Sequence, residues 1–174
     1  TAVGAGTYYV EATNSGCTAN GSIVVTVNTT PTLTLNNPAP VCSPLTVDIT
    51  AGAISSTDVG TMLYYSDVAM TILVPDATAV GTGTYYVEAT NSVCTANGSI
   101  VVTVNTTPTL TLNNPAPVCS PLTVDITAGA ISSTDVGTML YYSDVAMTIL
   151  VPDATIVGAG TYYVEATNAG CTAN

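Results

Sequence analysis

The residues of this chain with distinctive side-chain chemistry are its five cysteines, Cys17, Cys42, Cys94, Cys119 and Cys171. Their spacing is regular: the positions 94 and 17 differ by 77, and the same difference separates Cys171 from Cys94 and Cys119 from Cys42. In an oxidising setting, cysteines of this kind form disulfides by default, and an odd number is expected in a window cut from a repeat. We therefore expect disulfides between these cysteines.

Carboxylates are the other candidates, since a pair of them can act as general acid and base. The aspartates recur at the same interval, mostly beside turn-type residues, as Asp48, Asp58, Asp67 and Asp76 and then as Asp125, Asp135, Asp144 and Asp153. This placement favours solvated surface charges over a catalytic pair. The chain has no histidine, the commonest general base, and a Ser or Cys nucleophile needs an activating neighbour. We expect no enzyme activity and no catalytic, cofactor-binding or metal-binding residues.

The charge balance limits the partners. The chain has no Lys or Arg and 11 Asp plus Glu, which gives a formal charge of −11. Binding to nucleic acid requires basic side chains that neutralise phosphates, so nucleic acid and anionic membrane surfaces are expected to be repelled. The apolar runs, such as SIVVTV, are much shorter than the roughly 20 residues of a membrane-spanning helix. No membrane insertion is expected.

The sequence repeats itself. GTYYVEATN occurs at 6–14, 83–91 and 160–168, and residues 21–77 are identical to 98–154. A fixed period of this kind is typical of stacked structural units. We divide the chain into 1–30, the last two strands of one repeat; 31–107, a complete repeat; and 108–174, a repeat without its last strand. The few exchanges between copies are bland: Ala79 against Ile156, Thr82 against Ala5 and Ala159, and Val93 against Gly16 and Gly170.

Each repeat has the pattern of short β-strands. Within 31–107, alternating and β-branched runs predict strands at 32–35, 45–50, 61–66, 70–74, 84–91 and 99–105. In the second of these, Leu45, Val47 and Ile49 are expected on one face. Asn97-Gly98 is a strong hairpin-turn signal. Six or seven short strands in a single repeat, with no helical period, predict a β-sandwich.

The entry to the strand at Gly83-Thr84-Tyr85 resembles strand F of an immunoglobulin-like domain. Together, NPAPVCSPLTVDITAGA and GTYYVEATNSVCTANGSIVVTVN resemble the tandem Ig-like repeats of large secreted Bacteroidota adhesins, including those exported by type IX secretion and used in gliding. The resemblance covers the whole chain. It implies an all-β fold of tandem immunoglobulin-like β-sandwich repeats of 77 residues each. In this fold Tyr8, Tyr85 and Tyr162 would be tyrosine corners. The chain departs from antibody-type domains, because it has no Trp and Val87 stands where the strand-F cysteine would be.

The same resemblance bears on the disulfides. Two-cysteine Ig-like domains favour pairing within a repeat, which would join Cys42 to Cys94 and Cys119 to Cys171. In the usual Ig strand order, however, Cys42 and Cys94 lie at opposite ends of the sandwich, roughly 30–40 Å apart, whereas bridged Cα atoms must lie within about 7 Å. An inter-repeat pairing, Cys42 with Cys171, is slightly preferred. Both pairings remain open at this stage.

The near-identity of the copies favours a structural role over a specialised binding site. The resulting hypothesis is a non-catalytic extracellular repeat that forms the stalk or filament of a cell-surface adhesin, with repeats of about 35–40 Å. Its partners would be neighbouring repeats, and other filaments or surface glycans.

One alternative is a carbohydrate- or surface-binding array that uses the Tyr64-Tyr65 and Tyr85-Tyr86 pairs. The other is calcium binding between repeats, for which no dense acidic loop exists. The sequons at Asn20, Asn28, Asn97 and Asn105 are interpreted as coincidental. We also expect the sequence to be part of a longer covalent polymer. Completion by a strand donated from another chain is the less simple account, because the donor would bring a surplus copy of 161–168.

Overall fold

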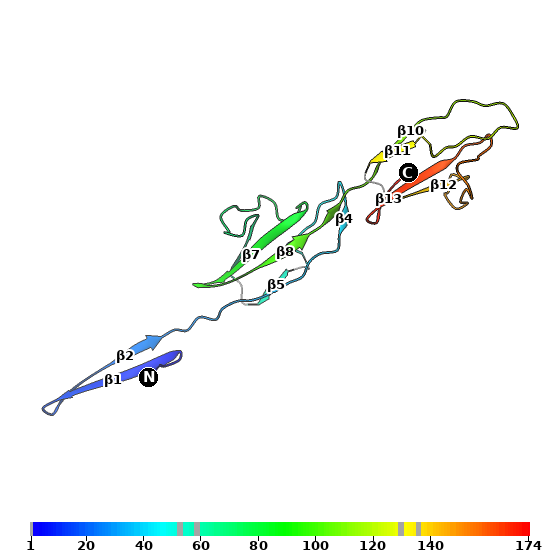
Figure 1. The fold of residues 1–174 in the computed structure, drawn as a ribbon. Helices are drawn as coiled ribbons and strands as arrows, with labels where there is room; N and C mark the ends of the chain where they lie inside the picture. The colour runs from blue at the N-terminus through cyan, green and yellow to red at the C-terminus, as the bar shows by residue number, and fades with distance from the viewer. Residues whose placement is uncertain (1, 52–53, 58–59, 129–130, 135–136) are drawn as a thin grey trace. The chain divides into compact units, whose positions relative to one another are not determined.

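The structure is a computed structural model of the 174-residue chain, and it describes residues 2–51, 54–57, 60–128, 131–134 and 137–174. These residues form β-strands and turns and contain no helix (Figure 1). The chain divides into two compact units. The first comprises Thr1–Asn36, Ala51–Pro75 and Thr84–Ile100, and the second comprises Asn37–Thr50, Asp76–Gly83 and Val101–Asn174.

The first unit contains a hairpin and two further sheets. In the hairpin, β1 (Gly6–Asn14) pairs with β2 (Cys17–Val25) in antiparallel register. The further sheets consist of the antiparallel pair β3 (Thr32–Leu35) and β5 (Ile54–Thr57), and of β6 (Thr61–Tyr65), most of β7 (Gly83–Asn91) and most of β8 (Cys94–Val102) in that order. All nine residues of β1 are exposed, so this hairpin contributes no core.

The second unit also contains three sheets among its described residues, one of them parallel. Its strands are the parallel pair β4 (Val41–Cys42) and β9 (Val104–Asn105), the antiparallel pair β10 (Thr109–Leu112) and β11 (Ile131–Thr134), and the sheet of β12 (Thr138–Tyr142), β13 (Tyr163–Asn168) and β14 (Cys171–Ala173). The order of the last sheet is β12–β13–β14, and its pairings are antiparallel.

Alternation along the strands builds the core. In β7, Val87 and Ala89 are fully buried while their neighbours are partly exposed, as expected for a strand with one inward face. The buried hydrophobic residues of the first unit are Tyr65, Val87, Ala89 and Ile100. Those of the second are Val47, Ile49, Val80, Val102, Ile126, Tyr142, Val157, Val164, Ala166 and Cys171. Among the described residues, no polar or charged residue is buried.

These features confirm the predicted fold class. The chain is all-β and immunoglobulin-like, made of short strands in β-sandwich sheets. The strands expected at 32–35 and 61–66 are present as β3 and β6, and the strand expected at 84–91 is present as β7.

Two expected strands are wrong. Residues 45–50 form only the isolated bridge between Val47 and Val80, because the Asp48 carboxylate accepts hydrogen bonds from the backbone and hydroxyl of Thr50 and turns the chain. Val47 and Ile49 are buried as expected, whereas Leu45 is 62% exposed. Residues 70–74 form no regular strand: Met70 (φ 53°) ends the turn that begins at Asp67, and Leu73 makes a single antiparallel bridge to Tyr65, flanked by the hydrogen bonds from Ser66 N–H to Ile72 O (2.9 Å) and from Val74 N–H to Tyr64 O (2.8 Å).

The expected hairpin turn at Asn97-Gly98 is also wrong. Both residues lie inside β8, and the turn between β7 and β8 is at Ser92-Val93, where Ser92 has a φ of 54°. Gly98 serves another purpose, because a Cβ built there would lie 2.7 Å from Leu35 Cδ1. The absence of a side chain at Gly98 therefore leaves room for the side chain of Leu35, the last residue of β3.

Candidate functional site: the Cys42–Cys171 disulfide

Cys42 is held by a short parallel strand pair. Residues Val41 and Cys42 of β4 lie opposite Val104 and Asn105 of β9. Backbone bonds frame the pair, since Val41 N–H donates to Thr103 O (3.2 Å) and Ser43 N–H donates to Asn105 O (2.8 Å). Pro40 and Pro44 have no N–H to donate, so the strand cannot extend far in either direction.

Cys171 is placed by a tight hairpin turn. Ala169 (φ 47°) and Gly170 (φ 83°) are the two central residues between β13 and β14, and Asn168 lies opposite Cys171. Two successive residues with positive φ make a turn of type I′, whose twist matches that of the flanking strands. The turn places Cys171 in the core, where the residue is only 1% exposed.

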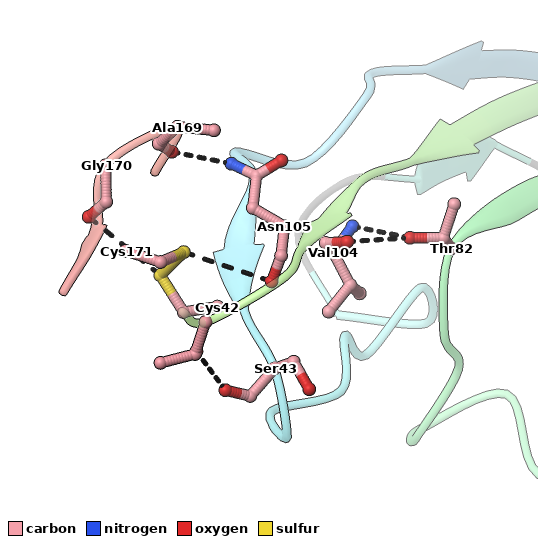
Figure 2. Close-up of a disulfide and its surroundings, with 9 residues drawn as sticks. Cys42, Ser43, Thr82, Val104, Asn105, Ala169, Gly170 and Cys171 are labelled. Atoms are coloured by element: carbon pink, nitrogen blue, oxygen red, sulfur yellow. Dashed lines mark hydrogen bonds between the residues drawn. A yellow bond between two sulfur atoms is a disulfide. The ribbon is translucent and has the colours of Figure 1, made fainter. Parts of the chain in front are cut away.

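The structure joins these two cysteines by a disulfide (Figure 2). The S–S distance is 2.04 Å and the Cα–Cα distance is 5.6 Å, across a sequence separation of 129 residues. This is the pairing preferred in the sequence analysis. The same molecule therefore cannot contain the intra-repeat pairs of Cys42 with Cys94 and of Cys119 with Cys171.

Asn105 ties together the same two segments without a covalent bond (Figure 2). Its backbone lies opposite Cys42, and its side-chain amide donates a 2.8 Å hydrogen bond to the carbonyl of Ala169. Its own carbonyl oxygen lies 3.9 Å from the Cys171 sulfur. This is a van der Waals contact, because a disulfide sulfur carries no hydrogen. Sequence reasoning missed this role, since it treated Asn105 as an incidental sequon.

Thr82 forms a second clamp on β9. Its hydroxyl accepts a hydrogen bond from Val104 N–H (2.7 Å) and donates one to Val104 O (3.1 Å). Ala159, the counterpart of Thr82 in the other copy, has no hydroxyl with which to make these two hydrogen bonds, so the exchange is not bland. The signal in the sequence was the loss of a hydroxyl at an otherwise repeated position.

The other cysteines, Cys17, Cys94 and Cys119, are free thiols. Cys94 is half-buried, and its sulfur lies 3.6 Å from the carbonyl oxygen of Asn28. This contact repeats the one between Cys171 and Asn105. Cys17 and Cys119 are exposed.

The aspartates cap turns. Asp67 accepts hydrogen bonds from the backbone N–H of Ile72 and from the N–H and hydroxyl of Thr71. Asp76 accepts bonds from the hydroxyl and N–H of Thr78. Asp144 and Asp153 repeat these two caps in the other copy, and Asp125 repeats the cap that Asp48 forms with Thr50. Asp58 and Asp135 lie outside the described residues.

These hydrogen bonds stabilise the charged carboxylates. The Ile72 N–H, with the groups of Thr71, lowers the pKa of Asp67, and the Ile149 N–H with Thr148 does the same for Asp144. For Asp76 and Asp153, the main cause of the lowered pKa is the threonine hydroxyl two residues on. The expectation of aspartates beside turns therefore has a specific structural cause.

Two of the tyrosines make the bond that defines a tyrosine corner. The hydroxyl of Tyr8 donates to Gly4 O (2.9 Å), and that of Tyr162 donates to Gly158 O (3.2 Å). Tyr85 has the corresponding position in β7. The paired tyrosines do not form an exposed platform, because Tyr65 is 9% exposed and lies opposite the half-buried Tyr86.

Within the described ranges, no group of three or more His, Cys, Asp or Glu side chains could hold a metal ion. The same ranges include no helix that is long and apolar enough to cross a membrane.

Comparison with known proteins gives only distant likenesses. No protein-family model matches the chain, and no curated protein matches it significantly. The solved structure of titin domains A168–A170 is 13% identical, with a TM-score of 0.41, and the match covers 98% of this chain and 71% of that one. The N-terminal four Ig domains of Dscam1 isoform 6.9 give 14% identity and a TM-score of 0.41, with 91% and 49% covered.

Sidekick-1 immunoglobulin domains 1–5 give 11% identity and a TM-score of 0.37, with 97% of this chain and 43% of that chain covered. TM-scores at this level do not by themselves establish a shared fold. The immunoglobulin-like assignment therefore rests on the strands, the pairings and the tyrosine corners described above.

Proposed function

We propose that the chain is a non-catalytic structural repeat from the stalk or filament of an extracellular cell-surface adhesin. The observation that carries this proposal is the disulfide between Cys42 and Cys171. These cysteines belong to two successive copies of the sequence, 31–107 and 108–174, so each staple of this kind links one copy to the next.

A disulfide that links two successive copies suits a protein segment that bears tension. Force applied at the ends of the chain passes from residue 42 through the disulfide to residue 171 and bypasses the residues between them. Asn105 adds a hydrogen bond across the same junction. Each further copy of the sequence would add one more junction of this kind, so the number of copies sets the length of the stalk.

The composition supports the same setting. A disulfide persists outside the reducing cytosol, which fits an extracellular location. With no Lys or Arg, the chain offers no cleavage site for trypsin-like proteases. The Tyr64-Tyr65 and Tyr85-Tyr86 pairs are largely buried, so they do not favour a carbohydrate-binding array.

Electron microscopy of native assemblies tests the proposal. We expect thin fibres with an axial repeat of about 35–40 Å, the length of one sandwich. Addition of a thiol reductant should make the fibres measurably more flexible, because it opens the staples. Compact particles with a catalytic turnover, or fibres whose stiffness does not respond to reductant, would contradict it.

A further inference from the structure

The loop closed by the disulfide is longer than the sequence repeat. Cys42 and Cys171 are separated by 129 residues, whereas the copies follow one another at an interval of 77, the difference between the positions 119 and 42. Cys119, the counterpart of Cys42, therefore lies inside this loop. If every junction between copies has the same disulfide, each loop begins before the previous one has ended.

The junction before this one has the same local geometry. Cys94 is the counterpart of Cys171, and its sulfur lies 3.6 Å from the carbonyl oxygen of Asn28. The Cys171 sulfur lies 3.9 Å from the carbonyl oxygen of Asn105, the counterpart of Asn28. The cysteine that follows strand β7 is thus placed against the preceding copy in the same way as the disulfide-bonded Cys171.

We propose that overlapping disulfides keep the stalk in one covalent piece after its backbone has been cut. The inference rests on the proposed function, because it requires covalently continuous copies. In such a stalk Cys94 is bonded to the preceding copy and Cys119 to the following one, each across the 129 residues of the observed disulfide. Each bond forms when two thiols transfer two electrons and two protons to a small disulfide, which becomes two thiols.

No single cut separates a stalk of this kind. A peptide bond between Cys42 and Cys94 lies within two loops, the one that ends at Cys94 and the one that begins at Cys42. A peptide bond between Cys94 and Cys119 lies within one loop, which the disulfide of Cys42 closes. Since the pattern repeats, every peptide bond away from the ends of the stalk is bypassed by at least one disulfide.

Separation of the stalk requires three cuts in neighbouring intervals. Cys94 is attached to the copy before it, and Cys42 is attached through its disulfide to the copy after it, so the two connections cross. Each cut must fall in a different interval between consecutive cysteines: 17–42, 42–94 and 94–119. Any two of these cuts leave a covalent path from one end of the stalk to the other.

This arrangement makes the stalk tolerant of proteolysis at its exposed turns. Such turns are preferred sites of nicking, and the turn between β7 and β8 includes Val93, which is 83% exposed. Hydrolysis of a peptide bond there adds one water molecule and leaves the disulfides intact. Without disulfides between copies, the same cut would break the only covalent path along the stalk.

The unmodified chain provides the first test, because it has one glutamate in each copy, namely Glu11, Glu88 and Glu165. The oxidised protein is alkylated at its free thiols and cleaved to completion by a glutamate-specific protease in urea. We expect residues 12–88 to remain joined to residues 166–174 while residues 89–165 are released, because the disulfide passes over that fragment. Residues 89–165 joined to either neighbour, or three separate fragments, would overturn the proposal.

A new trypsin site tests a single cut. The chain has no Lys or Arg, so Thr106→Arg creates one site, at an exposed residue between Cys94 and Cys119. After trypsin treatment the oxidised variant should migrate as one species in a denaturing gel without reductant. With reductant it should give two fragments, 1–106 and 107–174. Separation without reductant would show that no disulfide spans this interval.

Thr29→Arg is the matched control. The residues on both sides of Thr29 repeat those around Thr106, and Thr29 lies outside the loop closed by Cys42 and Cys171. Trypsin should release residues 1–29 of the 174-residue chain with or without reductant. Retention of this fragment without reductant would show that random crosslinks hold the pieces together, which also overturns the proposal.

The native stalk gives the closing test. Cleavage after every glutamate should leave material of very high mass in denaturant without reductant, because fragments from alternate copies stay joined. Reductant should convert it into fragments of 77 residues, the interval between Glu11 and Glu88. Digestion continues until the reduced sample contains only these fragments, so that incomplete cutting cannot imitate the result.

Two contrary outcomes are distinguishable in this test. Fragments of low mass without reductant overturn the overlapping disulfides and leave the stalk function untouched. Undigested native protein that already has a low mass in denaturant contradicts the stalk function itself.

Discussion

The side-chain amide of Asn105 donates a 2.8 Å hydrogen bond to the backbone carbonyl of Ala169, which lies in the hairpin turn directly before the disulfide-bonded Cys171. Covalent and non-covalent links therefore hold the same two segments. We expect this hydrogen bond to hold the turn in place when the disulfide is reduced.

The first prediction concerns this bond. Asn105→Asp replaces the donor with a carboxylate that faces a carbonyl oxygen, and it should cost about 1–3 kcal/mol of unfolding free energy. The loss should be larger in reductant, where no disulfide holds the turn in place. Urea unfolding followed by tyrosine fluorescence measures it, with Asn28→Asp, the repeated and exposed position, as control. Equal losses in the two variants would refute the role of Asn105.

The second prediction concerns the disulfide. Cys42→Ser should lower the unfolding free energy of the second unit by about 2–5 kcal/mol, because it frees a loop of 129 residues in the unfolded chain. Cys119→Ser is the matched control, since it is the same residue in the other copy and is exposed and unpaired. If both variants unfold at the same urea concentration, the disulfide contributes nothing to stability.

The third prediction concerns the turn before Cys171. Gly170 has a φ of 83°, so Gly170→Val should cost about 1–2 kcal/mol for forcing a side chain into the left-handed region. No atom crowds the site, so the cost is conformational. Gly81→Ala, also uncrowded but without positive φ, should change little. Thermal unfolding compares the two, and a neutral Gly170→Val would show that the turn adapts as it does at Val93.

The fourth prediction concerns pH. The folded-state pKa of Asp67 and of Asp144 lies below the ordinary value of 3.8, so the caps stabilise the fold fully above that pH. The stabilisation is lost as the pH falls through the lowered pKa. Asp67→Asn/Asp144→Asn retains an acceptor oxygen without the charge, so its melting temperature should fall less than that of the wild type between pH 6 and pH 2.

Acidification also removes the repulsion among the eleven acidic side chains, and a control variant separates this effect from the caps. Glu11→Gln changes an exposed charge on β1, and its melting temperature should follow the wild-type pH profile. An Asp67→Asn/Asp144→Asn profile parallel to that of the wild type would exclude the caps as the source of acid sensitivity.

The sequence predicted the strands best where alternation is strict and both faces differ, as in β7, where Val87 and Ala89 point inward. It failed where a side chain competes with strand geometry. Asp48 and Asp67 bind nearby N–H and hydroxyl groups and bend segments whose hydrophobic pattern suggested strands. The turn signal at Asn97-Gly98 misled because glycine there serves packing against Leu35.

The site was only partly predictable for a related reason. Cysteine spacing and the strand order of Ig-like domains pointed to Cys42 with Cys171, because those arguments concern positions along the chain. The roles of Asn105 and Thr82 depend on which backbone groups face them across the fold. No pattern in one sequence gives that information, although the change from Thr82 to Ala159 was visible.

Single-molecule stretching between Thr1 and Asn174 tests the central claim most directly. In the oxidised protein, the disulfide limits the extension to residues 1–42 and 171–174, about 150 Å at 3.3–3.6 Å per residue. Adding a thiol reductant should release the 129-residue loop and lengthen the chain by about 430–460 Å. An oxidised chain that extends to the same full length as the reduced one would contradict the account, because force would then not pass through Cys42 and Cys171.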